Sequence, residues 1–193
     1  MAWVSTSPLV KTYTLEEFWE LPEPPDRSKL ELIAGVLYMT PPPGYLHNNS
    51  VSRLVRLLVD HQRKIDDRGK VYVPRAGIVK GPNSWLEPDL FYIAANTNAL
   101  SDPEYPQYFS TADLVIEVIS PGSAIYDRNT KADTYAALGV KELWLVDEVS
   151  GFIELRTLEG DQYGASVVFE RDDYVNSVVL PGFEVKVSSV FDD

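Results

Sequence analysis

The sequence predicts a single α/β domain, built from a parallel strand–helix–strand unit and several antiparallel hairpins. The run DLVIEVIS, residues 113–120, is almost wholly apolar, which is typical of a central strand covered on both faces. Helical spacing follows it and then the strand KELWLVD, residues 141–147, so a crossover joins the two strands. A chain of 193 residues that is 45% hydrophobic can bury one core, so we expect one domain over residues 1–193.

The N-terminal part of the chain predicts a short helix and a hairpin. Thr14 and Glu17 have the spacing of a capping box, which predicts a helix over TLEEFWEL. The proline-rich, charged residues 22–29 are typical of a surface connector. The segments LELI and VLYM are separated only by Ala-Gly, so they form a hairpin that carries Glu31.

The middle of the chain predicts one long helix and three strands. Apolar residues recur at positions 51, 54, 55 and 58, which is the spacing of one helix face, and the helix runs on toward Gly69. The segments VYVPRAGIVK (residues 71–80), LFYIA (residues 90–94) and DLVIEVIS are rich in β-branched and aromatic residues. We expect these three to pair in one sheet.

The last third of the chain predicts the crossover helix and a set of antiparallel strands. Residues 126–138 have helical spacing and are followed by Gly139, a residue typical of the position just after a helix. The strands FIELRTL, SVVFE and PGFEVKV come later, and Glu-Gly and Asp-Asp pairs mark the turns.

Composition excludes several classes of site. The chain has no cysteine, so any bound metal must be held by oxygen or imidazole ligands. Its formal net charge of -12 repels phosphate backbones, which argues against a general nucleic-acid coat protein. The N-terminus lacks the pattern of a secretory signal and no segment has bilayer-spanning length, so we expect a cytoplasmic protein with no membrane partner.

Two acidic residues are candidate ligands for a hard cation. Asp89 follows a proline at the start of a predicted strand, and Glu117 lies within an apolar strand, where an ionised carboxylate is costly unless it is paired or bound to metal. Adjacent strands could bring both together as oxygen ligands for Mg²⁺. The alternatives stay open: Asp89 as a turn-capping residue, and Glu117 in a buried ion pair with Lys131.

The crossover helix adds three polar residues on one face. Asp127, Lys131 and Tyr135 are spaced by four, so they point to the same side of the helix. Lys131 could orient an attacking water and offset charge on a phosphate, or it could simply pair with Asp127 at the surface. Lys141 is the other lysine considered for this role.

The same segments resemble the Uma family of restriction-endonuclease-like proteins, within the PD-(D/E)XK nuclease superfamily. The similar segments are ELIAGVLYMTPPPGYLH, EPDLFYI, DLVIEVISPGSAIYDRNTKADTYAALGVKELWLVD and the closing PGFEV, so they span most of the chain. The resemblance implies a restriction-endonuclease-like fold, a mixed central sheet flanked by helices with additional hairpins. It also implies Asp89 and Glu117 as metal ligands, with Mg²⁺ or Mn²⁺ as the cofactor.

Glu31 and His47 also match positions of that family. The chain departs from the superfamily's E-x-K pattern, because the residue two positions after Glu117 is Ile119. Lys131 looks like the displaced lysine of this family. From the residues alone, Glu31 could equally be an edge-strand charge, and His47 could be a core residue.

These observations favour a metal-dependent endonuclease that hydrolyses DNA. Asp89, Glu117, Lys131 and Glu31 are its expected catalytic residues, with His47, Asp127 and Tyr135 as accessory groups. The alternatives are an inactive nuclease fold that serves as a binding module, and a hydrolase of small phosphoesters. A two-fold homodimer is expected only because it is the commonest assembly.

Overall fold

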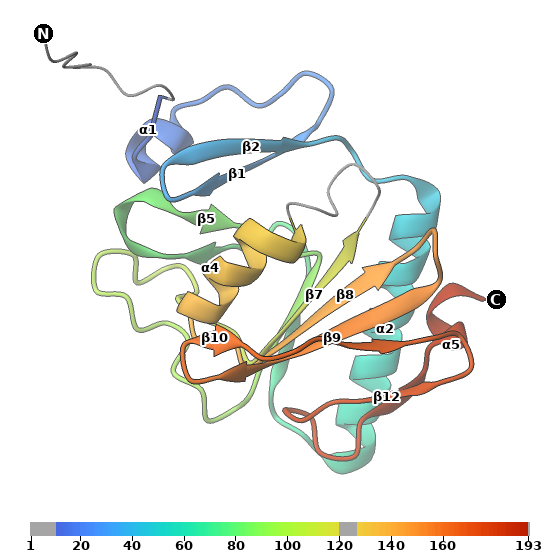
Figure 1. Ribbon diagram of the computed structural model, residues 1–193. Helices are drawn as coiled ribbons and strands as arrows, with labels where there is room; N and C mark the ends of the chain where they lie inside the picture. The colour runs from blue at the N-terminus through green and yellow to red at the C-terminus, as the bar shows by residue number, and fades with distance from the viewer. Residues whose placement is uncertain (1–10, 120–126, 193) are drawn as a thin grey trace, which may run out of the picture.

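The computed structural model describes residues 11–119 and 127–192, and its centre is a mixed sheet of seven strands (Figure 1). Its strands are β3 (Lys70–Tyr72), β6 (Leu90–Ile93), β7 (Leu114–Ile119), β8 (Glu142–Asp147), β9 (Phe152–Glu159), β10 (Gln162–Tyr163) and β11 (Val167–Phe169). They follow the order β10-β9-β8-β7-β6-β3, and β11 also pairs with β9. The pair β7–β8 is parallel and the other pairs are antiparallel, so the predicted α/β class and mixed sheet are confirmed.

The central strand β7 is buried along its whole length, as its apolar sequence predicts. Leu114, Ile116 and Val118 belong to one core cluster, which they share with Leu54 and Leu58 of the long helix. Val115 and Ile119 belong to a second cluster on the opposite face, together with Ala132 and Tyr135 of the crossover helix. Because side chains alternate along a strand, Glu117 also faces the crossover helix.

The long helix α2 (Tyr45–Ile65) confirms the apolar spacing seen in the sequence, and it covers one face of the central sheet (Figure 1). The opposite face carries the crossover, which consists of η2 (Asp127–Lys131) and α4 (Ala132–Ala137). The first of these is a π-helical turn rather than the α-helix that the spacing predicts. The expected start of this helix at Tyr126 lies outside the described residues.

A smaller sheet of four strands lies beside the central one and has the order β2-β1-β5-β4. Its strands are β1 (Lys29–Ile33), β2 (Val36–Thr40), β4 (Ile78–Val79) and β5 (Trp85–Leu86), and the short helix η1 (Gly81–Asn83) joins the last two. The predicted hairpin β1–β2 is confirmed, with the positive φ angles of 49° at Ala34 and 82° at Gly35 that its tight turn requires.

The prediction that residues 71–80 pair in the same sheet as β6 and β7 is wrong for half of that segment. Only β3 pairs with β6, whereas β4 belongs to the smaller sheet. Pro74 interrupts the segment, and a proline cannot donate a hydrogen bond to a strand ladder. The sequence analysis did not predict β5, which is only two residues long.

The remaining elements lie at the two ends of the chain. The capping box of Thr14 and Glu17 is present and begins α1 (Leu15–Trp19). The C-terminal part forms the hairpin β12 (Tyr174–Asn176) and β13 (Glu184–Lys186), and α5 (Ser188–Phe191) packs against α2. Within the described part of the chain, no helix is both long and apolar enough to cross a bilayer.

Candidate active site

Glu117 lies near the middle of β7 with only 2% of its surface exposed. The hydroxyl of Tyr135 donates a hydrogen bond of 2.6 Å to Glu117 Oε1, and Lys131 Nζ lies 3.2 Å from the same oxygen. Burial raises the pKa of Glu117 to about 7, although the charges of Lys131 and Lys29 act in the opposite direction. Without a bound cation, this carboxyl is therefore partly protonated at neutral pH.

Lys131 is the centre of a buried cluster of three carboxylates. Its Nζ lies 2.8 Å from Glu31 Oε2, 3.2 Å from Glu117 Oε1 and 3.3 Å from Asp127 Oδ1. Burial by itself would lower the pKa of Lys131, but these three acids together raise it well above the usual value. Lys131 is therefore a permanently charged ammonium group inside the protein.

The predicted inward face of the crossover helix is confirmed. Asp127, Lys131 and Tyr135 are all buried, and the last two both contact Glu117. The alternative position for the lysine is not used, because Lys141 pairs with Asp113 at 2.6 Å. A surface pairing of Lys131 with Asp127 alone is also wrong, since Lys131 is only 2% exposed.

Glu31 comes to the cluster from the smaller sheet. It lies in the middle of β1, is 1% exposed, and accepts a hydrogen bond of 2.9 Å from the backbone N–H of Glu87 through Oε1. Its other oxygen contacts Lys131. The reading of Glu31 as an exposed edge charge is therefore wrong, and the two sheets meet at this residue.

Asp89 lies between Pro88 and β6, on the strand that pairs with β7. The N–H of Val118 donates a hydrogen bond of 2.9 Å to Asp89 Oδ2, which fixes the carboxylate one residue away from Glu117. Burial would raise the pKa of Asp89, but the hydrogen bond from His47 and the charge of Lys29 lower it overall. Asp89 and Glu117, on adjacent strands, therefore have pKa values shifted in opposite directions.

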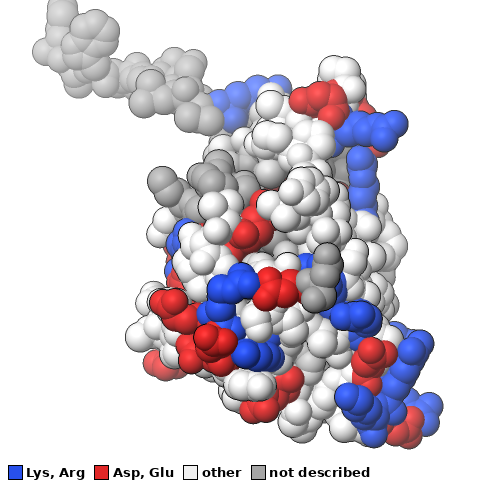
Figure 2. Space-filling view, turned by 90° about the vertical axis from the view of Figure 1, so that its right-hand side faces the viewer, with Lys and Arg blue, Asp and Glu red and all other residues white. Residues whose placement is uncertain are grey.

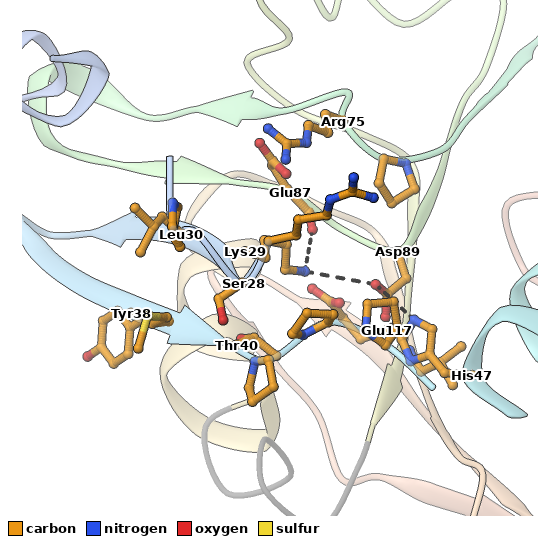
Figure 3. A pocket seen from close by; sticks show the side chains of 18 of the residues that line it. Ser28, Lys29, Leu30, Tyr38, Thr40, His47, Arg75, Glu87, Asp89 and Glu117 are labelled. Carbon is orange, nitrogen blue, oxygen red and sulfur yellow. Dashed lines mark hydrogen bonds and ion pairs between the residues drawn. The ribbon is translucent and has the colours of Figure 1, made fainter. Parts of the chain in front are cut away.

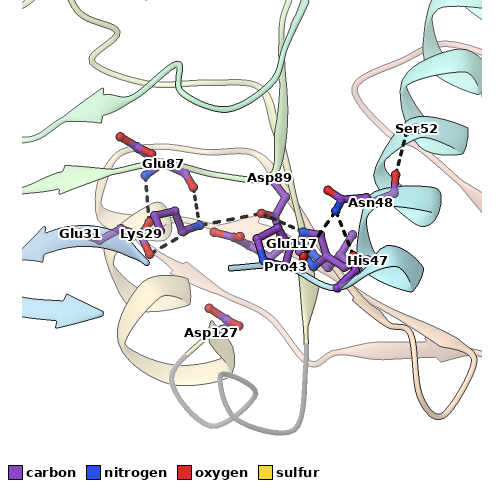
Figure 4. A network of polar contacts seen from close by, with 12 residues as sticks. Lys29, Glu31, Pro43, His47, Asn48, Ser52, Glu87, Asp89, Glu117 and Asp127 are labelled. Carbon is purple, nitrogen blue, oxygen red and sulfur yellow. Dashed lines mark hydrogen bonds and ion pairs between the residues drawn. The ribbon is translucent and has the colours of Figure 1, made fainter. Parts of the chain in front are cut away.

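His47 and Lys29 flank Asp89 from two different elements (Figure 4). His47 Nε2, in the first turn of α2, lies 3.4 Å from Asp89 Oδ1, and Asp89 raises the pKa of His47 although burial opposes this. Lys29 Nζ lies 3.8 Å from both Asp89 Oδ1 and Glu31 Oε2, and it donates a hydrogen bond of 2.8 Å to the carbonyl of Glu87.

The sequence analysis missed Lys29 because it assigned this residue to a surface connector. A usable signal was present: Lys29 precedes Glu31 by two positions, so both point to the same face of a strand. It also missed Glu148, which lines the same pocket and whose buried Oε2 has no hydrogen-bond partner among the described residues. Burial raises the pKa of Glu148, and the charge of His47 opposes that shift.

Asp89, Glu117 and Lys131 line a pocket of about 1340 Å³ that opens between the smaller sheet and α2. Figure 3 shows His47, Asp89 and Glu117 together at one end of the pocket, while Tyr38 and Leu30 lie apart from them. Arg75 and Glu87 reach in from the segments around the smaller sheet. Among the described residues, this pocket gives access to Asp89 and Glu117.

The donor set fits a magnesium ion better than a transition metal. Among residues 11–119 and 127–192, no three Asp, Glu, His or Cys side chains are grouped closely enough to hold a metal by themselves. Mg²⁺ is usually bound through one or two carboxylates and keeps several waters, and the pocket above Asp89 and Glu117 has room for them. Closed transition-metal sites instead use three or four N or S ligands.

Comparisons with known proteins agree with this fold. The chain is similar to a crystal structure described as a putative nuclease belonging to DUF820 from Anabaena variabilis, with a TM-score of 0.74 and 19% identity. The alignment covers 93% of this chain and 97% of that one. No curated protein matches the chain. A family model described as "Putative restriction endonuclease" matches residues 15–188, so the chain belongs to the Uma2 family.

Proposed function

We propose that this protein is a metal-dependent endonuclease that hydrolyses phosphodiester bonds of DNA. The observation that carries the proposal is the buried contact between Lys131 and Glu117, beside Asp89 on the adjacent strand and at the floor of an open pocket. An ion pair that only stabilises the fold does not need an adjoining pocket, whereas a hydrolytic site needs one to admit its substrate. Membership of the Uma2 family and the nuclease-like fold support the proposal.

Asp89 and Glu117 would hold Mg²⁺ or Mn²⁺ between β6 and β7. The bound cation supplies Lewis-acid chemistry, because it polarises a phosphoryl oxygen and lowers the pKa of a coordinated water. Asp89 is suited to this role because its lowered pKa keeps it ionised at neutral pH. Glu117 must lose its proton to bind, so the proposed site assembles more readily above pH 7 than below it.

Lys131 supplies positive charge next to the reacting phosphate. Its ammonium group would orient the attacking water and offset the charge that develops as the new oxygen–phosphorus bond forms and the bond to the leaving sugar oxygen breaks. Glu31 and Asp127 hold Nζ at 2.8 and 3.3 Å, so the group is preorganised. Tyr135 and His47 act as positioning residues, because each contacts one of the two proposed ligands.

Cleavage of DNA by matched variants tests the proposal. We expect the wild type to cleave single-stranded or supercoiled DNA with Mg²⁺ or Mn²⁺, and Glu117→Ala and Lys131→Ala to lose at least about a hundredfold in rate. Asp133→Asn, an exposed residue of α4, serves as the control and should retain activity. Cleavage by Glu117→Ala at the wild-type rate would refute the proposed mechanism. A wild type that neither cleaves DNA nor gains thermal stability from Mg²⁺ would instead indicate an inactive binding module.

A further inference from the structure

The proposed catalytic residues lie at the bottom of the pocket rather than on the open surface. Glu117 and Lys131 are each 2% exposed and Asp89 is 8% exposed. Duplex DNA is stiff over about 50 nm, so a duplex must be deformed before its backbone can bend down to a buried site. A single strand is flexible and can bend its backbone down to such a floor.

The wall of the pocket carries exposed apolar side chains. Trp19, Met39 and Val73 line it and are 40%, 66% and 43% exposed, and the prolines 41–43 continue the same surface. Large apolar side chains that remain exposed within one cavity usually indicate a binding surface. In a duplex the apolar faces of the bases are stacked on one another, whereas an unpaired base can stack on such a wall.

Trp19 is held in position by other aromatic rings. Its ring centroid lies 6.2 Å from that of Trp85 at an interplanar angle of 82°, and 5.4 Å from that of Tyr108. A ring fixed by its neighbours in this way loses little entropy when a base stacks on it. Trp19 therefore suits the role of a stacking platform at the pocket wall.

Positive charge lies at the pocket rim, although the chain as a whole is acidic. The exposed Arg27 and Arg75 line the pocket, and Arg75 pairs with the exposed Glu23 at 3.1 Å. Figure 2 shows Lys and Arg side chains interspersed with Asp and Glu side chains on the face that it draws. The acids Glu23, Glu87, Asp127 and Glu148 also line the pocket, so a bound strand meets charges of both signs there.

The size of the pocket favours more than one nucleotide. Pockets for drug-sized molecules measure about 300–1,000 Å³. At about 1340 Å³ this pocket exceeds that range, so a single small phosphoester would leave much of it unfilled. A short stretch of unpaired strand can fill the space from the apolar wall to the carboxylates.

We infer that the pocket selects an unpaired strand of DNA, which stacks a base on the wall formed by Trp19 and Met39, passes the ends of β1 and β2, and places a phosphodiester farther along the strand over Asp89 and Glu117. This inference rests on the proposed function, and it adds that cleavage is confined to single strands, flaps and bulges. Arg75 exchanges its exposed ion pair with Glu23 for a backbone phosphate at the rim.

The first test compares one strand in three forms with Mg²⁺: alone, annealed to its full complement, and annealed so that an internal segment remains unpaired. We expect cleavage of the free strand and of the unpaired segment, with at least about a hundredfold slower cleavage of the full duplex. Equal cleavage of the full duplex would overturn the inference while leaving the proposed nuclease intact.

The second test measures binding, so it does not depend on activity. Fluorescence anisotropy with a labelled oligothymidylate should show about tenfold weaker binding for Trp19→Leu. Met39→Ser and Arg75→Ala should each weaken it by about threefold. Met39 and Arg75 are exposed, so those two variants keep the test valid if Trp19→Leu is unstable. Tyr174→Leu and Arg63→Ala, exposed residues outside the pocket, should change binding less than about twofold.

The two tests distinguish failure of the proposed nuclease activity from failure of the proposed unpaired-strand pocket. A protein that binds oligothymidylate through Trp19 and cleaves nothing would contradict the proposed nuclease and support the unpaired-strand pocket. A protein that binds the duplex more tightly than the single strand, or that binds neither, would overturn the pocket assignment.

Discussion

The two proposed metal ligands, Asp89 and Glu117, experience opposite environments although they lie on adjacent strands. Asp89 accepts a backbone hydrogen bond and lies beside His47 and Lys29, and its pKa is lowered. Glu117 is more deeply buried, and its pKa is raised to about 7. Paired carboxyls with divergent pKa values are a recurring property of catalytic sites, where one stays ionised and the other titrates.

At the residue scale, Glu117→Gln should stabilise the metal-free protein at alkaline pH. Because the folded pKa of about 7 exceeds the usual glutamate pKa of 4.5, the folded state binds more protons between these values, and stability falls as pH rises from 4.5 through 7. The neutral amide of Gln does not ionise, so this loss of stability is absent from the variant. We expect its free energy of unfolding to exceed that of the wild type by on the order of 2 kcal/mol at pH 8, and by less at pH 5. Urea unfolding in the presence of a chelator measures it.

The control for this experiment is Glu154→Gln. Burial opposes the shift, but the pKa of Glu154 is lowered by hydrogen bonds from Arg156 and Arg128, so its charged form stabilises the fold above the unfolded pKa. We expect this variant to be less stable than the wild type at pH 8. If Glu117→Gln were less stable than the wild type by the same amount at pH 5 and pH 8, ionisation of Glu117 would not destabilise the fold, and the raised pKa would be contradicted.

A second prediction at this scale concerns metal binding. Mg²⁺ at about a hundred times its Kd should stabilise the wild type by about 2.7 kcal/mol, a rise in Tm of roughly 5–10 °C. The rise should be larger at pH 8 than at pH 6, because Glu117 must be deprotonated to bind. Differential scanning calorimetry should show that Asp89→Asn abolishes the shift and that Asp133→Asn retains it. An unchanged shift in Asp89→Asn would mean that the ion binds elsewhere.

At the scale of elements, the site depends on where the smaller sheet packs. Glu31 and Lys29 belong to β1, which pairs with β5 through Leu32 and Trp85. Gly77, just before β4, lies against the Trp85 ring, and a Cβ atom there would overlap the indole. The ring is only 8% exposed, so it cannot swing away.

Gly77→Ala should therefore destabilise the protein by about 2–4 kcal/mol through overpacking, and it should lower activity because β1 carries Glu31. Asp133→Asn, an exposed residue of α4, is the control for both effects. Chemical denaturation and the cleavage assay measure the two effects. A Gly77→Ala protein as stable as the wild type would contradict this packing of Gly77 against Trp85.

Long elements were predictable from the sequence and short ones were not. The apolar run of β7 and the apolar spacing of α2 each involve many residues. One residue that departs from such a pattern does not hide it. Strands of two residues such as β4 and β5 are too short to show an alternation of apolar and polar residues. Only their tertiary contacts define them. The π-helical start of the crossover likewise has no separate sequence pattern.

The candidate site was predictable to a similar degree. Asp89, Glu117 and Lys131 stand out because their charges interrupt apolar segments or follow a helical interval. Lys29 lies in β1, but its segment also contains the prolines and charges of a connector, and its role depends on the contact between two sheets. Sequence patterns describe single elements, so a residue that acts across two of them leaves a weak signal.

At the scale of the whole molecule, charge constrains the proposed binding of DNA. The net charge of -12 provides no general attraction to phosphates, and the pocket rim offers mainly Arg27 and Arg75. Affinity must then come from stacking, from the few rim contacts and from the metal. Binding should consequently respond to Mg²⁺ more strongly than to bulk salt.

Salt titration tests this prediction. For a single strand, the slope of log K against log salt is about -0.7 per phosphate neutralised, so two arginines predict a slope between about -1 and -2 at fixed Mg²⁺. Arg75→Ala should reduce the slope by about half. Anisotropy measured over a range of KCl concentrations gives these values, and a slope steeper than about -5 would reveal a basic surface that the pocket does not include.

The placement of Lys131 on a helix has one further consequence. In the E-x-K pattern the lysine would share a strand with the glutamate, but here Ile119 occupies that position and packs into the core instead. Lys131 and Glu117 therefore belong to separate elements, and the contact between them depends on how the crossover helix packs on the sheet. A small rotation of that helix would separate Lys131 from Glu117 without disturbing a single strand pairing.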